Sequence, residues 1–276
     1  MNRLSKEKQR LILHCLLEGN STRGTARLVD VSTHTVENLL VEAGEACSRF
    51  HDKHVRSLRI KGWVEIDEMW SFVYAKEKNV AKAKNPPDFA GHSWTHIAID
   101  AKTKLVISYR IGKREPRQTR WLLKDLRKRV LGRVSFATDG YSPYTKYTQK
   151  VFGDSVSLLN VVGTQKIKVS GNPDIDNENT TFVERHNLTM RMSMRRYARK
   201  TNAHSKLVDY QRAHLHLYIV WFNWCRIHET LRCSPAMEAG LTVELHSLDM
   251  ILGLIEARRS KPNRPKTYKK RAKSTL

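Results

Sequence analysis

The sequence predicts a small all-α segment followed by an α/β domain with a mixed sheet. Apolar residues recur at helical spacing three times within residues 1–50. From Trp63 onward, three strand-like stretches, a helical stripe and a fourth strand-like stretch follow in turn. That order is typical of a sheet covered by helices. We therefore expect a helical domain at 1–50, a linker at 51–61, an α/β domain at 62–257 and a basic disordered tail at 258–276.

The charge of the chain indicates a polyanionic partner. Its 276 residues include 50 Lys and Arg against 27 Asp and Glu, a formal charge of +23. A surplus of this size favours nucleic acid, with an anionic membrane surface as the alternative. No apolar run approaches the roughly 18 residues of a membrane span, and the N-terminus is too polar for a secretory signal, so we expect a cytoplasmic protein. The four cysteines form no C-x-x-C pair, which argues against a disulfide framework or a structural zinc site.

The first 50 residues are expected to form three helices. Ser5 caps the first, which ends at Gly19. A short helix over 23–29 and a longer one over 33–50 follow, and this arrangement is typical of a helix-turn-helix, whose last helix enters the major groove of DNA. The alternative is a plain three-helix bundle. The candidates for DNA contact are the short polar side chains that begin the longer helix, namely Ser32, Thr33, His34, Thr35 and Asn38.

Alternating apolar and acidic residues mark the first strand of the second domain. Val64 and Ile66 alternate with acidic Glu65 and Asp67, which is the period of a strand. Strands are expected at 63–73, 93–99, 105–111, 133–138 and 156–162, which gives a mixed five-stranded sheet. Helices are expected at 116–130, 143–151, 181–191, 207–227 and 247–258. The polar stretches 74–91 and 166–179 are expected to be loops.

Three acidic residues stand at positions suited to one site. Asp67 lies on the first strand, Asp139 where the fourth strand ends, and Glu184 on a helix. Ligands of open α/β sheets bind beyond the strand ends, which favours Asp139. Magnesium prefers carboxylate oxygens, and two such ions stabilise the attacking and leaving oxygens of a phosphoryl displacement. We therefore expect the three acids to hold two magnesium ions, although a lone acid on a helix is most often a solvated side chain.

Four strings of the sequence together resemble one protein family. They are Glu-Ile-Asp-Glu-Met-Trp-Ser-Phe-Val at 65–73, Ala-Thr-Asp-Gly-Tyr at 137–141, Val-Glu-Arg-His-Asn-Leu-Thr-Met-Arg at 183–191 and Arg-Arg-Tyr-Ala-Arg-Lys-Thr at 195–201. Through these strings the chain resembles the DDE transposases of the insertion-sequence-one family. The resemblance implies a ribonuclease-H-like catalytic domain and magnesium-dependent cleavage and transfer of DNA strands, with manganese as a substitute metal. It places the catalytic and metal-binding triad at Asp67, Asp139 and Glu184.

The same resemblance implies a DNA-contacting surface that follows Glu184. DDE enzymes often carry a basic residue seven positions past the glutamate, and Arg191 stands there, where it would touch phosphate near the scissile bond. Asn187 lies on the same helix face and is a second candidate, with a solvated helix face as the alternative. The basic residues expected to extend this surface are Arg195, Arg199 and Lys200.

Two further acids flank Asp67 on the first strand. Glu65 shares a strand face with Asp67 and is a candidate outer metal ligand. Glu68 points the other way and is expected to be structural. The matched motif assigns the metal to Asp67.

The sequence therefore predicts a transposase that binds double-stranded DNA at the ends of its element and at the target. Joining two ends needs two active sites, so we expect a homodimer or a larger assembly on DNA. Family members often carry a zinc-binding segment before the helix-turn-helix, and no cysteine pair matches it here, so end recognition is expected to depend on the helix-turn-helix alone. Two alternatives are a noncatalytic helix-turn-helix regulator built on a degenerate nuclease domain and a structure-specific nuclease that cuts without joining.

Overall fold

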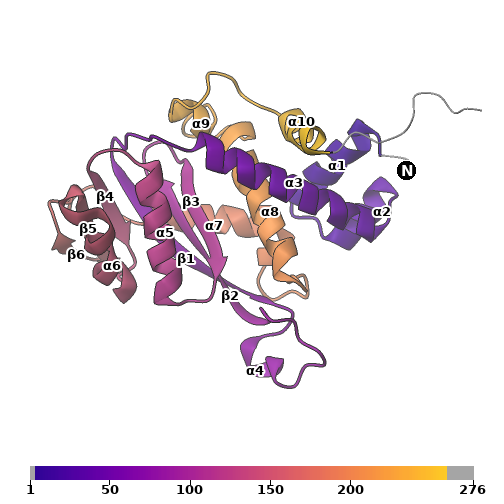
Figure 1. The fold of residues 1–276 in the computed structure, drawn as a ribbon, viewed down its shortest axis with the longest axis horizontal. Helices are drawn as coiled ribbons and strands as arrows, with labels where there is room; N and C mark the ends of the chain where they lie inside the picture. The colour runs from indigo at the N-terminus through magenta and orange to yellow at the C-terminus, as the bar shows by residue number, and fades with distance from the viewer. Residues whose placement is uncertain (1–3, 260–276) are drawn as a thin grey trace, which may run out of the picture.

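The chain folds around a mixed six-stranded sheet (Figure 1). The computed structural model describes residues 4–259. The strands are β1 (Trp63–Val73), β2 (Gly91–Asp100), β3 (Val106–Gly112), β4 (Val134–Thr138), β5 (Val156–Val162) and β6 (Gln165–Ser170). Their order is β3-β2-β1-β4-β5-β6, and β1 pairs antiparallel with β2 and parallel with β4. An antiparallel meander extended by parallel strands in this order is the ribonuclease-H-like fold, which confirms the predicted fold class.

The sixth strand corrects one prediction. The sequence pattern predicts a loop over 166–179 and a five-stranded sheet, and both predictions are wrong at β6, which pairs antiparallel with β5. β6 lies at the edge of the sheet and none of its residues is buried, so it adds little to the core. Lys166 and Lys168 lie on this strand, and lysines on an edge strand discourage pairing with another chain.

Helices cover both faces of the sheet. After β1 come α4 (Glu77–Val80), α5 (Pro116–Arg129), α6 (Ser142–Phe152), η1 (Gly153–Ser155), α7 (Thr181–Ser193), η2 (Arg195–Tyr197), α8 (Val208–Val220), the π-helix η3 (Trp221–Cys225), α9 (Pro235–Glu238) and α10 (Leu248–Arg258). Glu68 of β1 contacts Tyr144 of α6, whereas Asp67 contacts Asn187 of α7. Because adjacent residues of a strand point to opposite faces, α6 and its neighbour α5 lie across the sheet from α7 (Figure 1). Every helix between residues 4 and 259 is too short or too polar to cross a membrane.

The three predicted N-terminal helices are confirmed. They are α1 (Lys6–Leu17), α2 (Thr22–Val29) and α3 (Thr33–His54). The hydroxyls of Ser5, Ser21 and Ser32 accept hydrogen bonds from first-turn amides at the three N-termini, which stabilises each helix start. α3 continues past residue 50 to His54, so the first part of the predicted linker is helical. α3 packs along α8, and the buried residues of both belong to the hydrophobic core of the sheet (Figure 1).

α3 and α8 approach each other closely at Gly44. A Cβ at this position would lie 2.4 Å from the Cα of Ala213. We expect Gly44→Ala to lower the free energy of unfolding by about 1–3 kcal/mol, because the two helices must separate. The matched control is Gly253→Ala in α10, where nothing lies within 4 Å and the better helix propensity should stabilise by up to about 1 kcal/mol. Urea denaturation measures both, and a neutral Gly44→Ala would contradict the close approach.

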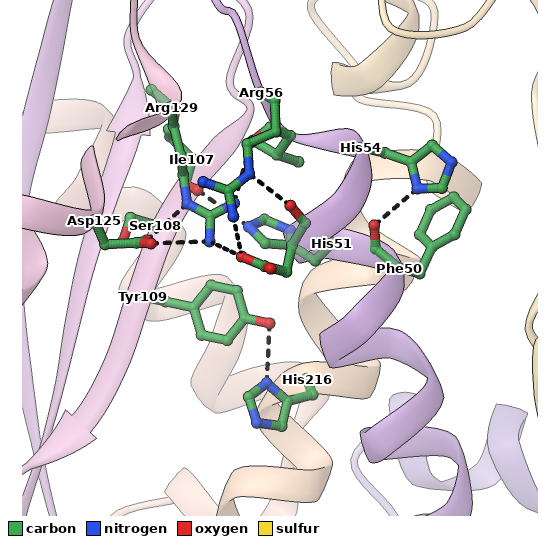
Figure 2. Close-up of polar contacts among 12 residues, drawn as sticks. Phe50, His51, His54, Arg56, Ile107, Ser108, Tyr109, Asp125, Arg129 and His216 are labelled. Carbon is green, nitrogen blue, oxygen red and sulfur yellow. Dashed lines mark hydrogen bonds and ion pairs between the residues drawn. The ribbon is translucent and has the colours of Figure 1, made fainter. Parts of the chain in front are cut away.

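A polar network joins the end of α3 to the sheet (Figure 2). Arg129 of α5 is 6% exposed and donates to Asp125 from Nε at 2.6 Å and to Asp52 of α3 from Nη2 at 3.0 Å. His51 of α3 donates from Nε2 to the carbonyl of Ile107 on β3 at 3.0 Å. Burial lowers the pKa of His51 to about 3, so this ring is neutral at physiological pH. Buried polar contacts as well as apolar packing therefore fix the N-terminal helices to the sheet.

The start of the predicted basic tail contacts α3. Arg258, the last residue of α10, pairs with Glu45 at 2.5 Å, and Arg259 pairs with Glu42. Two cations of the predicted tail are therefore bound to acids of this chain. The remaining tail residues, 260–276, lie outside the part of the chain that the structure describes.

Candidate functional site

The sheet register places Asp67 beside Asp139. β1 and β4 pair in parallel up to Ile66↔Thr138. Asp67 and Asp139 are the next residue along each of these two neighbouring segments. The backbone N–H of Tyr141 donates to Oδ1 of Asp139 at 3.0 Å and holds this carboxylate just past the end of β4. Two of the three acids that the sequence predicts for the site therefore lie together at a strand end.

Glu68 supplies the third carboxylate of this group. Asp67, Glu68 and Asp139 each offer an oxygen, and these oxygens lie within 4.8 Å of one another. Glu68 is buried, accepts from the Tyr144 hydroxyl and lies 3.4 Å from Nδ1 of His96. Burial alone would raise the pKa of Glu68, but these two partners lower it below its ordinary value, so Glu68 is ionised. Glu68 does point away from Asp67 along the strand, as predicted, yet its carboxylate reaches the group.

Glu184 lies close to this group but outside it. Its side chain is exposed at the start of α7, and its Oε1 accepts from the Thr180 hydroxyl at 2.8 Å. One turn further along α7, Asn187 is buried and donates to Oδ2 of Asp67 at 2.7 Å. Since residues three apart share a helix face, the Glu184 face of α7 lies over Asp67. The charge of Glu184 is accordingly among the causes that raise the pKa of Asp67.

Glu65 fixes the start of α7 to β1. Its Oε2 accepts from the backbone N–H of Val183 at 2.8 Å, and its Oε1 accepts from Nε1 of Trp63 at 3.0 Å. The first amides of a helix have no partner within the helix, so a carboxylate here satisfies one of them and stabilises the helix N-terminus. Glu65 is fully buried, and burial raises its pKa to about 7. It acts as a positioning residue next to Glu184.

Arg114 is the main basic side chain at the site, and the sequence patterns do not single it out. It follows β3 and lies 3.2 Å from both Glu68 and Asp139. Its guanidinium lies over the rings of Trp94 and Tyr141, at 4.9 and 4.3 Å from their centroids. The only signal in the sequence is a basic pair, Lys113 and Arg114, just before the helix that begins at Pro116. Arg114 offsets part of the negative charge that the carboxylates bring together.

The donor set of this group fits a hard divalent cation. Asp67, Glu68 and Asp139 offer oxygen ligands only, which suits magnesium or manganese. Burial, helped by the charges of the neighbouring carboxylates, raises the pKa of Asp67 to about 6. Burial also raises the pKa of Asp139, while Arg114 opposes the shift. With a pKa of about 6, Asp67 is mainly deprotonated at neutral pH and can therefore act as a metal ligand.

This pKa shift predicts pH-dependent metal binding. A metal ligand must be deprotonated, so protons compete with the ion below the pKa of Asp67, near 6. We expect the affinity for Mn²⁺ to rise by up to about tenfold per pH unit on going upward to about pH 6 and to level off above it. Electron paramagnetic resonance of free Mn²⁺ measures the affinity. Asp67→Asn is the control, since it should bind weakly and lose this dependence; an unchanged profile in that variant would contradict the assignment.

The predicted DNA-contacting residues of α3 lie at its exposed start. Ser32, Thr33, His34 and Asn38 are exposed, but Thr35 is half-buried and its hydroxyl lies 2.8 Å from that of Ser32. Ser32 and Thr35 therefore also form the helix cap. A pocket of about 840 Å³ separates this helix start from residues 195–206, and Thr33 and Arg195 both line it. Thr33 of the predicted helix-turn-helix and Arg195 of the predicted basic surface therefore line the same pocket.

The predicted contacts after Glu184 differ in exposure. Arg195, Arg199 and Lys200 are exposed, whereas Arg191 is half-buried. The charges of Arg199 and Asp67 both act on Arg191, which places it near the carboxylate group. Asn187 is buried with its amide bound to Asp67, so it orients a carboxylate in this structure.

The fold and the site together define a ribonuclease-H-like protein with a carboxylate centre where the end of β4 meets the middle of β1. The chain is 29% identical over 145 residues to the InsB protein of insertion element iso-IS1n from Shigella dysenteriae, a match that covers 52% of this chain and 84% of that protein. This relative confirms the resemblance to the insertion-sequence-one family that the motifs predict. No protein-family model matches the chain.

Solved structures with some similarity are complexes of the Mos1 transposase. One is its paired-end complex with the left transposon end, at 16% identity and a TM-score of 0.25, covering 81% of this chain and 79% of that one. Another is the Mos1 mariner paired-end complex with manganese, at 15% identity and a TM-score of 0.27, with the same coverage. TM-scores this low do not establish a shared fold, so the fold class stands on the strand order.

Proposed function

We propose that this chain is a DNA transposase that binds the terminal inverted repeats of an insertion element and catalyses metal-dependent strand cleavage and strand transfer. The observation that carries the proposal is the meeting of Asp67, Glu68 and Asp139 within 4.8 Å, with the Glu184 face of α7 lying over Asp67. The similarity to the InsB protein of an insertion element supports it. The formal charge of +23 suits a DNA substrate.

The side chains of the site have separable roles in this proposal. Asp67 and Asp139 would hold the metal together with Glu184, and Glu68 would join them from the other face of β1. Bound magnesium supplies Lewis acidity that stabilises charge on the phosphoryl oxygens. Asn187 orients the Asp67 carboxylate, and Glu65 holds the start of α7 in place. Because Glu184 is outside the group of oxygens, we infer that its side chain turns from Thr180 toward Asp67 when metal is held.

DNA binding is assigned to two surfaces. The exposed start of α3, with Ser32, Thr33, His34, Thr35 and Asn38, reads the element ends as the recognition helix of a helix-turn-helix. Arg191 contacts phosphate near the cleaved bond, and Arg195, Arg199 and Lys200 extend that contact. Residues 1–50 then act as the DNA-binding domain and residues 62–257 as the catalytic domain. The protein acts in the cytoplasm, at the nucleoid, as a homodimer or larger assembly.

A strand-transfer assay tests this function. The full chain is incubated with Mg²⁺, a supercoiled target plasmid and labelled duplexes taken from the DNA that flanks its coding sequence. We expect nicks at one defined end sequence and labelled strands joined to the plasmid. Binding without cutting would favour a noncatalytic regulator, and cutting without joining would favour a nuclease; either result contradicts the proposal.

A further inference from the structure

A basic groove runs between α5 and α6, outside the carboxylate site. Its volume is about 690 Å³. Five lysine and arginine side chains line it, namely Arg120, Lys124, Arg127, Lys128 and Lys150. All five are exposed. The like charges around the groove repel one another, and a bound polyanion would offset this repulsion.

These cations have no acidic partner within the described residues. The one acid that lines the groove is Asp125, and it turns inward to Arg129 and to the hydroxyl of Ser108. None of the five groove cations forms an ion pair with any acid between residues 4 and 259, whereas Arg117 on the same helix pairs with Glu115. The positive charge of the groove is therefore left for an external ligand.

The spacing of the charges fits a DNA backbone. Arg120, Lys124 and Lys128 lie four residues apart along one face of α5, so the row spans about 12 Å. That length matches about three to four nucleotides at roughly 3.4 Å of rise each. Lys150 of α6 forms part of the opposite wall. A row of cations that faces one further lysine suits a phosphate strand lying along the helix.

The aromatic side chains of the groove favour a duplex over a single strand. Trp121 is 39% exposed, but the guanidinium of Arg110 lies 4.1 Å from the centre of its ring. Tyr147 is half-buried. Single-strand binding grooves stack successive bases on open aromatic faces, and here one face of the exposed ring is covered. The groove can then contact DNA through its phosphates only, and phosphate contacts carry no sequence preference.

We propose that the α5–α6 groove binds the phosphate backbone of a second DNA duplex, without regard to its sequence. That α5 and α6 lie across the sheet from α7 supports a path separate from the one past Glu184. That this duplex would be a second one rests on the proposed function, in which another duplex lies at the carboxylate site. The groove would hold DNA that is not being read by the helix-turn-helix, such as the target.

A titration with short duplexes tests the groove. The probes are random-sequence duplexes of about 10 base pairs, which is one helical turn. The groove variant combines Arg120→Gln, Lys124→Gln and Lys128→Gln. The control variant combines Lys76→Gln, Lys78→Gln and Lys82→Gln, exposed lysines in and beside α4 that give the same loss of charge. Isothermal titration without metal, repeated over a range of NaCl concentrations, gives the number of duplexes bound and the salt slope.

We expect the groove variant to bind one duplex fewer per chain than the parent, with a salt slope smaller by about 2–3, because three phosphate contacts are lost. The control variant should keep the parental number of duplexes. Equal losses in both variants, or no loss in the groove variant, would overturn the proposal. A groove variant that keeps DNA binding but loses binding to phosphatidylserine vesicles would overturn it in favour of a membrane.

This test and the test of the proposed function fail separately. The titration needs neither metal nor strand cleavage. If the parent cuts no DNA but the groove variant binds one duplex fewer, the proposed transposase function is refuted and the proposal for the groove stands. If the parent transfers strands but the groove variant binds as many duplexes as the parent, the proposal for the groove is refuted and the transposase function stands.

Discussion

Replacing Asp139 by asparagine is expected to lower the rates of DNA strand cleavage and strand transfer by at least about 10³-fold. The carboxylate lies within 4.8 Å of oxygens of Asp67 and Glu68, and the amide of asparagine removes one charge from this donor set. A bound metal contributes several kcal/mol of charge stabilisation to such a reaction, and about 4 kcal/mol corresponds to 10³-fold in rate. The strand-transfer assay with Mg²⁺ measures the loss.

The control for Asp139→Asn is Asp154→Asn. Asp154 is exposed in η1, so the same chemical change there should leave both rates within about twofold. Circular dichroism should show both variants folded, because Asp139 is bound by only one backbone amide of its turn and by Arg114. If Asp139→Asn joined strands as well as the parent, the assignment of the site would be wrong.

Replacing Arg129 by methionine is expected to lower the free energy of unfolding by about 3–5 kcal/mol. Arg129 is 6% exposed and binds Asp125, Asp52 and the carbonyl of Val55 (Figure 2). Removing one partner of a buried ion pair leaves the other charge buried without compensation, and this strongly destabilises the folded state. Against a total stability of about 5–15 kcal/mol, the loss is large. Thermal unfolding should show a Tm lower by about 10 °C.

Arg127→Met is the matched control for this prediction. Arg127 is exposed two residues earlier on the same helix, so its replacement should change the stability by no more than about 0.5 kcal/mol. The double variant Arg129→Met with Asp125→Leu should recover part of the loss, because it removes the uncompensated charge as well. Equal effects of Arg127→Met and Arg129→Met would show that the network contributes nothing specific.

The sequence predicts most of the sheet because β1 alternates apolar and acidic residues and short apolar stretches mark the strands after it, with an acid directly after β4. Parallel pairing of β1 with β4 then places Asp67 beside Asp139 without further information. The three N-terminal helices follow from their serine caps and apolar spacing. The end of α3 is harder to predict, because residues 51–54 are polar and basic and become helical through contacts such as that of His51 with Ile107.

Other features depend on contacts between distant segments, which spacing does not encode. β6 carries alternating residues but buries none, so only its pairing with β5 makes it a strand. The pleat of β1 correctly predicts that Glu68 points away from Asp67, yet it says nothing of how far the two carboxylates reach. Arg114 enters the site from a connection between β3 and α5, where no periodic pattern exists.

The central claim is that carboxylates from β1, the end of β4 and α7 hold one metal centre. Replacing Mg²⁺ by Fe²⁺ and adding ascorbate and peroxide generates radicals at the bound ion, which cut the nearby backbone. Mass spectrometry of the full chain locates the cuts. We predict that they cluster near Asp67, Asp139 and Glu184 and vanish when Mg²⁺ is added in excess. Cuts elsewhere, or at Asp67 and Asp139 but never on α7, would contradict the account.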